Sequence, residues 1–352
     1  MADTRFTALG MSGSGKTCYI LGMYYDMCVG RNGFTLVTDN AMASKLERWM
    51  DIIDNCSSGM DRFPAGTPAS EVIDYSFKLC HNNMDIMSFD WSDYAGGALR
   101  QKEENPEVFD KLQKSIESST ALYIFVDGEY FCDESPDKRM RNVKRKCAAI
   151  INPYIKTFYD THNKSLPPII FVVTKSDLCR KYVTNDEVVS VIKESFSPVF
   201  APNVNTFITG VSLGINISDD DYKGEVEPVN IHIPFFIGIF YEFYIRYIAY
   251  KDKVKADRNE REHKISQNNQ EIKNENGKYF IFPFWSLTDY DKVSQLRSEI
   301  ETQKSSIAEN ESKLDRYRNL LKVVHGELIR QEKNYTIFRD GSEIDHFPDF
   351  EF

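Results

Sequence analysis

The order of apolar and polar positions predicts two differently built regions along the chain. Through about residue 250, short apolar runs alternate with amphipathic stretches, as in a sheet with covering helices. Ala121–Val126 and Ile169–Val173 are wholly apolar, as buried parallel strands are. From Val229 onward the pattern becomes helical. We therefore expect an α/β sheet domain that is followed by long helices.

Alternation and apolar runs also predict the remaining elements of the first region. Val72–Leu79 and Asp85–Trp91 alternate on either side of a turn at residues 81–83, which predicts an antiparallel hairpin. Asp39 is a candidate cap for a following helix. The other expected strands are Phe6–Leu9 and Thr206–Ile208, with Phe34–Thr38 as a further candidate, and the other expected helices are Lys16–Val29, Arg139–Tyr159 and Asp186–Phe196. We expect a mostly parallel, six-stranded sheet with helices on its faces.

Two long helices are predicted after the sheet, each of about 45 residues or about 70 Å. Asn276-Gly277 interrupts the first helix, and the second opens near Asp289. The second carries a stripe that steps by four and three residues, and eight of its ten members are apolar: Leu296, Ile300, Gln303, Ile307, Asn310, Leu314, Tyr317, Leu321, Val324 and Leu328. This stripe is a coiled-coil pattern. It favours an antiparallel hairpin, with a parallel dimer through the same stripe as the alternative.

These patterns divide the chain into three predicted parts. Residues 1–250 form the sheet domain, residues 251–335 form the helical hairpin with an aromatic tip at 279–285, and residues 336–352 form a tail with a small hairpin. The aromatic tip is either packed or exposed as a contact surface for a protein partner. Ile231–Tyr250 is the most apolar stretch, but its polar interruptions favour a buried helix over a membrane span.

Composition narrows the possible partners and the compartment. The formal net charge of −10 argues against nucleic acid as the main partner, because phosphate neutralisation requires clustered Lys and Arg. The seven cysteines are scattered and form no C-x-x-C pair, which favours reduced thiols over disulfides or a metal site. No signal peptide is visible at the N-terminus. We therefore expect a cytoplasmic protein without a transmembrane segment.

The first candidate site is a glycine-rich loop between an apolar strand and a helix. Residues 10–17 read G-M-S-G-S-G-K-T and match the P-loop pattern G-x-x-x-x-G-K-[ST]. In such a loop, main-chain N–H groups and the start of the following helix surround the β-phosphate of a nucleotide. Lys16 would supply a positive charge to the β- and γ-phosphates, and the Thr17 hydroxyl would bind Mg²⁺. A plain glycine-rich turn would not account for the lysine.

Two later motifs, in the same order, give the chain a resemblance to the translation-factor-related (TRAFAC) class of P-loop GTPases, which includes the Ras-like small GTPases. The first is D-Y-A-G at residues 93–96, directly after an expected strand, which matches the D-x-x-G motif of that class. The resemblance implies that Asp93 holds Mg²⁺ through water. It also implies that the main-chain N–H of Gly96 contacts the γ-phosphate.

The second motif is T-K-S-D at residues 174–177, directly after an apolar strand, and it matches the [NT]-K-x-D guanine motif. A carboxylate at Asp177 can accept hydrogen bonds from guanine N1–H and the exocyclic amine together, whereas adenine lacks this donor pair. The resemblance implies that Lys175 stacks its stem on the base. The alternative is that Asp177 simply lies in the first turn of a capped helix.

Two further positions follow from the resemblance. Thr67 is the best candidate for the threonine that contacts Mg²⁺ and the γ-phosphate, and the less favoured alternative is that it merely sits in a Pro/Gly turn. Gly210-Val211-Ser212 stands where the last base-contacting loop is expected, although it departs from the usual Ser-Ala-Lys. Gly97 occupies the position of the glutamine that orients the attacking water in small GTPases, so intrinsic hydrolysis should be slow or depend on a partner's arginine.

The sequence W-S-D-Y-A-G-G at residues 91–97 is also similar to that of bacterial GTPases of conflict or defence systems, the so-called double-GTPase group. We expect a Mg²⁺-dependent guanine-nucleotide switch that binds GTP or GDP. The alternatives are a non-catalytic scaffold whose helices recruit partners, and an ATPase. The expected nucleotide-binding residues are Gly10, Gly13, Ser14, Gly15, Lys16, Thr17, Cys18, Gly96, Thr174, Lys175, Asp177 and Val211, the expected metal ligands are Thr17, Thr67 and Asp93, and the expected catalytic residues are Lys16 and Thr67.

Overall fold

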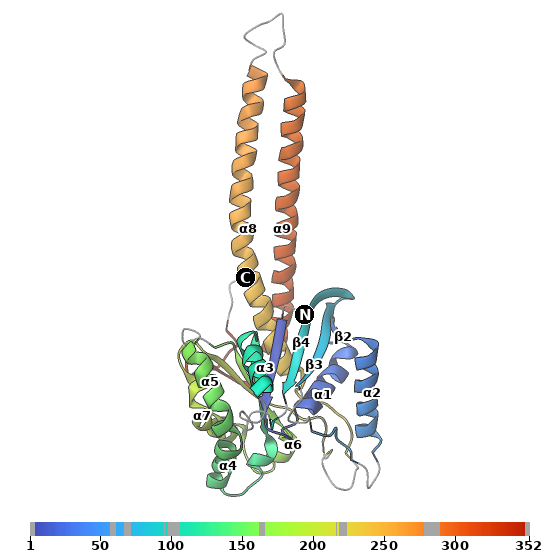
Figure 1. Ribbon diagram of the computed structural model, residues 1–352, viewed down its shortest axis with the longest axis vertical. Helices are drawn as coiled ribbons and strands as arrows, with labels where there is room; N and C mark the ends of the chain where they lie inside the picture. Colours follow the sequence, from blue (N-terminus) through green and yellow to red (C-terminus); the bar gives the residue numbers. More distant parts are fainter. Residues whose placement is uncertain are drawn as a thin grey trace, which may run out of the picture. The chain divides into compact units, whose positions relative to one another are not determined.

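The computed structural model describes residues 4–56, 61–66, 72–94, 96–97, 106–161, 166–215, 217, 224–277 and 289–348. The chain divides into two compact units. The sheet unit comprises Met1–Tyr241 with His325–Glu351, and the helical unit comprises Glu242–Val324. Two long helices, α8 (His232–Gly277) and α9 (Tyr290–Arg330), contribute residues to both units (Figure 1). None of the helices in the described ranges is long and apolar enough to cross a lipid bilayer.

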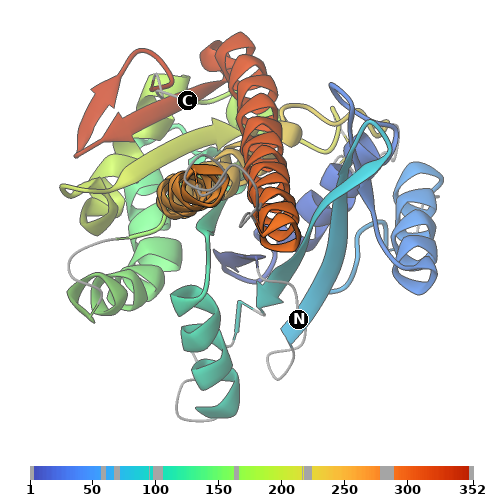
Figure 2. The ribbon, with the colours of Figure 1, turned by 90° about the horizontal axis from the view of Figure 1, so that it is seen from above.

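A nine-stranded mixed sheet forms the centre of the sheet unit, in the order β2-β3-β4-β1-β5-β6-β7-β8-β9. The strands are β1 (Thr4–Gly10), β2 (Phe34–Val37), β3 (Val72–His81), β4 (Met84–Tyr94), β5 (Ala121–Asp127), β6 (Ile169–Thr174), β7 (Asn205–Gly210), β8 (Tyr335–Arg339) and β9 (Ser342–Ile344). Neighbouring strands from β4 to β7 pair in parallel, and those at both edges pair antiparallel. The prediction of six strands is wrong, because β2 extends one edge and the C-terminal strands β8 and β9 (red in Figure 2) extend the other beside β7.

Two short segments of the chain form the structures that local sequence signals predicted for them. Asn82 and Asn83 connect β3 to β4 with positive φ angles of 49° and 63°, the backbone of a tight two-residue hairpin turn. The Asp39 side chain accepts a hydrogen bond of 2.9 Å from the amide of Met42 and so caps α2. Both predictions are confirmed.

Helices cover the two faces of the sheet, and β5 shows how its residues divide between them. The helices are α1 (Lys16–Cys28), α2 (Asn40–Asp54), α3 (Pro106–Glu117), α4 (Pro136–Val143), α5 (Ala149–Thr161), α6 (Ser176–Cys179) and α7 (Asn185–Ser195), with a π-helical turn at Lys144–Ala148 and 3₁₀ turns at Gly128–Phe131, Ser197–Phe200 and Glu332–Asn334. Leu122 and Ile124 belong to the core under α3, α5 and α7. Tyr123 and Phe125 point the other way, where Phe125 meets Tyr19 of α1. The strand therefore has no solvent-facing side, which explains its continuous apolar sequence.

The first turns of α8 are buried against this second face of the sheet. Every residue from Ile231 to Tyr241 is buried. The Tyr123 hydroxyl donates to the carbonyl of Pro234 at 3.2 Å, and Gly238 makes room for it, since a side chain at that position would overlap the hydroxyl. The first half of the apolar stretch, residues 231–241, is thus part of the core of the sheet unit, as expected from its sequence, whereas Ile245 farther along is 52% exposed.

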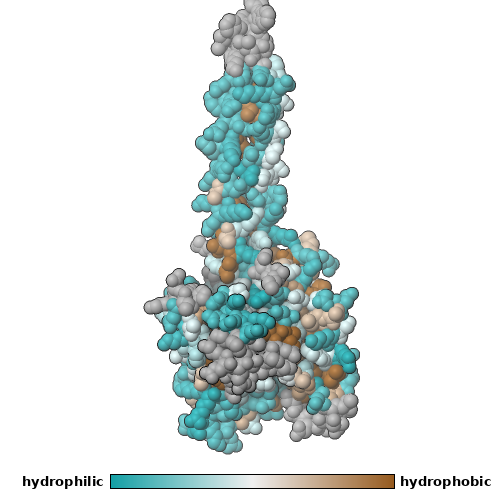
Figure 3. All heavy atoms as spheres, viewed as in Figure 1, coloured by the Kyte–Doolittle hydropathy of each residue, from teal (hydrophilic) through white to brown (hydrophobic). Residues whose placement is uncertain are grey.

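The helical unit consists of antiparallel segments of α8 and α9. Arg261 pairs with Gln303, Asn268 with Glu299 and Glu271 with Lys292, so that partner numbers fall along α9 as they rise along α8. All ten positions of the predicted stripe on α9 are buried or half-buried. Figure 3 shows that the visible outer surface of this unit is mostly hydrophilic (teal). The stripe is therefore used within the chain, between its own two helices.

Candidate functional site

The glycine-rich loop connects the end of β1 to the start of α1. Gly13 and Gly15 have positive φ angles of 77° and 80°, in the left-handed region that side chains rarely adopt. Gly15 directly precedes α1, whose first residue is Lys16. The loop therefore turns back so that the N-terminal end of a 13-residue helix faces the same space as the carboxyl ends of the parallel strands.

The Lys16 side chain folds over the loop. Its ammonium group donates to the carbonyls of Gly10 at 3.1 Å and Met11 at 3.2 Å, and lies 3.9 Å from a carboxylate oxygen of Asp93. Burial lowers the pKa of Lys16, and the charge of Asp93 opposes that shift. The site thus holds a nearly buried cation next to a helix N-terminus, which suits a ligand with several negative charges.

Asp93 and Thr17 form the oxygen pair of the site. Asp93 lies near the end of β4, opposite Ala8 of β1, and is fully buried. The Thr17 hydroxyl donates to Asp93 Oδ2 at 2.8 Å. A hydroxyl and a carboxylate are the hard oxygen ligands that Mg²⁺ prefers, and proteins typically supply only one or two side chains where phosphates supply the rest. This pair has the chemistry of a Mg²⁺ site of that kind.

Gly96 packs directly against the loop. A side chain at this position would overlap the amide nitrogen of Ser12 and the main chain of Met11. Only glycine allows the segment after β4 to come this close to the glycine-rich loop. The D-x-x-G and P-loop motifs, separated by about 80 residues in the sequence, therefore meet at one point.

At the other end of the site, the segment after β6 folds around Lys175. Lys175 has a left-handed backbone (φ 51°), and its ammonium group pairs with Glu129 at 2.6 Å and Asp127 at 3.2 Å. Burial alone would lower the pKa of Lys175, but the hydrogen bond to Glu129 and the charge of Asp127 raise it above its ordinary value. Thr174 binds the glycine-rich loop through a hydrogen bond of 3.0 Å to the carbonyl of Ser14.

Asp177 lies beside the loop that follows β7. Its Oδ1 atom accepts a hydrogen bond of 2.8 Å from the Ser212 hydroxyl. The main chain joins the same two loops, since the amide of Ser176 donates to the carbonyl of Val211 at 3.1 Å. Ser212 thus holds the Asp177 carboxylate at the rim of the site. The sequence had indicated Ser212 only as part of the loop at 210–212.

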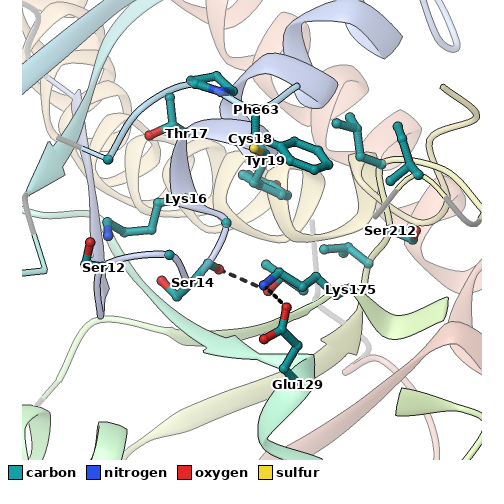
Figure 4. Close-up of a pocket in the computed structure, with 18 of the residues that line it drawn as sticks. Ser12, Ser14, Lys16, Thr17, Cys18, Tyr19, Phe63, Glu129, Lys175 and Ser212 are labelled. Atoms are coloured by element: carbon teal, nitrogen blue, oxygen red, sulfur yellow. Dashed lines mark hydrogen bonds and ion pairs between the residues drawn. The ribbon is translucent and has the colours of Figure 1, made fainter. Parts of the chain in front are cut away.

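One cavity of about 440 Å³ collects these groups, which is a usual size for a small-molecule site. Figure 4 shows Lys16, Thr17, Phe63, Lys175 and Ser212 around it. Of the expected residues, the cavity is lined by Gly13, Ser14, Gly15, Lys16, Thr17, Cys18, Gly96, Thr174, Lys175, Asp177 and Val211. Gly10 and Asp93 stand behind this lining and touch it through Lys16 and Thr17. Thr67 lies outside the described residues.

Among the residues at the site that the sequence did not single out are Phe63, Asp127 and Glu129, whereas Ser212 was named only as part of the loop at 210–212. Asp127 is the last residue of β5 and Glu129 follows it, and polar residues at the carboxyl end of a buried parallel strand are a signal that could have identified them. Burial raises the pKa of Cys18 to about 11, so its thiol is neutral where it lines the cavity.

Comparison with known families finds a match, which covers part of the chain. Residues 7–150, less than half of the chain, match the family described as Double-GTPase 1. The match includes the P-loop and the D-x-x-G motif but ends before residues 174–177. It confirms the resemblance to P-loop GTPases of the double-GTPase group, and it supports a domain that binds guanine nucleotide. No curated protein matches the chain.

Proposed function

We propose that the sheet unit binds GTP or GDP with Mg²⁺ and hydrolyses GTP slowly, as a nucleotide-dependent switch. The observation that carries the proposal is the arrangement of the cavity. It has the glycine-rich loop with Lys16 at one end and the Asp177 carboxylate at the other. A ligand with an anionic tail and a hydrogen-bond-donating base matches both ends at once.

The phosphate end supplies positive charge and a metal site. The start of α1 and the Lys16 ammonium group would bind the β- and γ-phosphates, at the expense of the Lys16 contacts to Gly10 and Met11. Thr17 and Asp93 would hold Mg²⁺, which would supply positive charge beside the same phosphates. The close contact between Gly96 and the glycine-rich loop supports a role for the Gly96 main-chain N–H at the γ-phosphate.

The base end supplies the selectivity for guanine. Asp177 would accept from N1–H and the exocyclic amine of guanine, while the Ser212 hydroxyl fixes the carboxylate in place. Adenine offers no such pair, and a buried acceptor left without its donors disfavours the wrong base strongly. The apolar ring of Phe63 and the stem of Lys175 also line the cavity and can cover the faces of the base.

Slow hydrolysis follows from Gly97, which has no side chain to orient water where small GTPases have glutamine. We propose Thr67 as the residue that contacts Mg²⁺ and the γ-phosphate, and Lys16 as the catalytic cation. Loss of the γ-phosphate would then release the segments around Thr67 and Gly96. A partner that supplies an arginine would increase the rate.

A second candidate function is a scaffold that binds nucleotide without hydrolysing it. The absence of a glutamine after Gly96 favours it, and the long α8–α9 pair, as a coiled coil, would recruit the protein partner. The two functions differ in phosphate release, measured with the purified protein alone and with candidate partners. We further propose a cytoplasmic location, because none of the seven cysteines forms a disulfide in the structure, which suits a reducing compartment.

The proposed base recognition is tested with Asp177→Asn. The substitution turns a double acceptor into a group with one acceptor and one donor, so GTP should bind more weakly and xanthosine triphosphate more tightly. Titration calorimetry with Mg²⁺ and GTP, ATP or xanthosine triphosphate measures this change. The control is Asp186→Asn in the first turn of α7, outside the cavity lining. Equal binding of GTP and ATP by the parent, or unchanged GTP binding by Asp177→Asn, contradicts guanine recognition.

A further inference from the structure

Arg62 is a buried cation held by main-chain carbonyls from distant parts of the chain. Its side chain is 5% exposed. Nε donates to the carbonyl of Ile53 at 2.7 Å, Nη1 to that of Ile217 at 3.0 Å, and Nη2 to that of Gly224. Burying a guanidinium group is unfavourable unless its N–H groups are bonded, so these contacts stabilise one arrangement of the three segments.

The residues directly after Arg62 form one wall of the cavity. Phe63, Pro64, Ala65 and Gly66 all line it, and we call residues 62–66 the strap. At its far end the strap reaches the phosphate side, since a Cβ on Gly66 would lie 3.3 Å from the Ser12 hydroxyl. The strap therefore follows the cavity from the base side to the glycine-rich loop.

The segment that Arg62 binds belongs to the base side of the cavity. Leu213 and Ile217 line the cavity just after Ser212, which holds Asp177. The hydrogen bond from Arg62 to Ile217 therefore joins the strap to the loop after β7, and these two walls both belong to the cavity. Phe63 of the strap points into the same space (Figure 4).

We propose that Arg62 is a positioning residue that fastens the strap to the loop after β7 and so determines how long the nucleotide stays bound. This inference rests on the proposed nucleotide binding. In this proposal a nucleotide between the two walls leaves as they separate, and separation breaks the bond from Arg62 to Ile217. Weakening the Arg62 contacts should therefore accelerate release more than it slows association.

The test is Arg62→Lys, because a lysine keeps the charge but cannot present the planar fork that reaches several carbonyls at once. We expect a fluorescent GDP analogue to leave the full-length protein about tenfold faster, equivalent to about 1.4 kcal/mol. The matched control is Arg139→Lys. Arg139 is also 5% exposed and also donates to two carbonyls, those of Asp133 and Tyr182, but it does not line the cavity.

The possible outcomes separate the inference from the proposed function. Failure of the parent protein to bind any guanine nucleotide overturns both. A parent that binds GDP, with unchanged release from Arg62→Lys or equal acceleration in Arg139→Lys, overturns the inference alone. Should Arg62→Lys not fold, Pro64→Gly loosens the strap without disturbing the buried cation. Release from that variant should be several-fold faster, and an unchanged rate would also overturn the inference.

Discussion

The sheet unit and the helical unit use polar side chains in opposite ways. In the sheet unit, Lys16 of α1 and Asp177 of α6 line one cavity, and Asp93 of β4 stands directly behind its lining, 3.9 Å from the Lys16 ammonium group. In the helical unit, pairs such as Arg261–Gln303 and Asn268–Glu299 repeat along the interface of α8 and α9. Convergence makes each polar residue of the cavity difficult to replace. In the helical unit, many similar pairs connect α8 and α9, so the loss of any one pair should matter less.

The apolar residues of the two units also differ in how they are arranged. The sheet unit contains a cluster of interlocked, fully buried rings, in which Trp91 contacts Phe6, Tyr19 and Tyr123. The stripe on α9 is buried at Leu296 and Ile300 but only half-buried at Ile307. The sheet unit thus concentrates its stabilisation at a few positions, while the helical unit distributes it.

The largest effect on stability is expected for Trp91→Ala. It removes the centre of the aromatic cluster and should reduce the free energy of unfolding by about 3–5 kcal/mol. Urea unfolding followed by far-UV circular dichroism measures the change. The control is Trp49→Ala on α2, a half-buried ring that packs with Lys45 and should cost much less. Equal losses for the two variants would argue against a concentrated core.

Lys16→Ala should remove nucleotide binding from a sheet unit that remains folded. We expect at least a hundredfold loss of affinity for GTP, or about 2.7 kcal/mol, because no other cation of the cavity lies on the glycine-rich loop among the described residues. Calorimetry with Mg²⁺ measures it, with Lys156→Ala on the exposed side of α5 as control. Parent-like affinity of Lys16→Ala would mean that the phosphates bind elsewhere.

The acids of the two units should respond differently to pH. Glu327, 5% exposed, accepts hydrogen bonds from Asn32 and Arg330. Burial would raise the pKa of Glu327, but these partners lower it below its ordinary value of 4.5. Its contribution is therefore complete above that value and is lost as the pH falls through the lowered pKa. Acidification from pH 7 to 4 should destabilise the protein, and Glu327→Gln should weaken this dependence.

The urea midpoint at pH 7 and pH 4 measures this difference. At pH 7, Glu327→Gln should cost about 1 kcal/mol, the loss of a charged acceptor that the amide oxygen replaces only in part. Glu309 of the helical unit also has a lowered pKa, through its hydrogen bond to Lys313, but it is exposed. Glu309→Gln should leave the pH dependence of stability unchanged. If it weakened this dependence as much as Glu327→Gln does, the acids of the two units would not differ in their response to pH.

The fold could be predicted where the signal is local. The run Ala121–Val126, the asparagine turn and the Asp39 cap each depend on neighbours a few residues away. The pairing of β8 with β7 joins Ile337 to Phe207, and nothing in either sequence specifies so distant a partner. The number of strands was therefore wrong although most of the strands were recognised.

The candidate site likewise contains residues that the sequence could predict and residues that it could not. The P-loop and T-K-S-D were recognisable because each motif is contiguous, and the cavity brings them together. Arg62 carries no signal in the sequence, because its role comes from carbonyls of residues 53, 217 and 224. The pairing of Lys175 with Glu129 likewise depends on β5 and β6 being neighbours in the sheet.

The smallest effect is expected for Asn310→Leu in the helical unit. Asn310 is a polar member of the stripe, with hydrogen bonds of 2.9 Å to Asp257 and 3.0 Å to Tyr250. Leucine removes both bonds but adds an apolar side chain to the stripe, so the free energy of unfolding should change by no more than roughly 1 kcal/mol. Its effect should be on specificity, because a polar asparagine within the stripe, here half-buried, restricts register, and light scattering would then detect additional oligomers. A loss as large as that of Trp91→Ala would mean that this unit, too, depends on single residues.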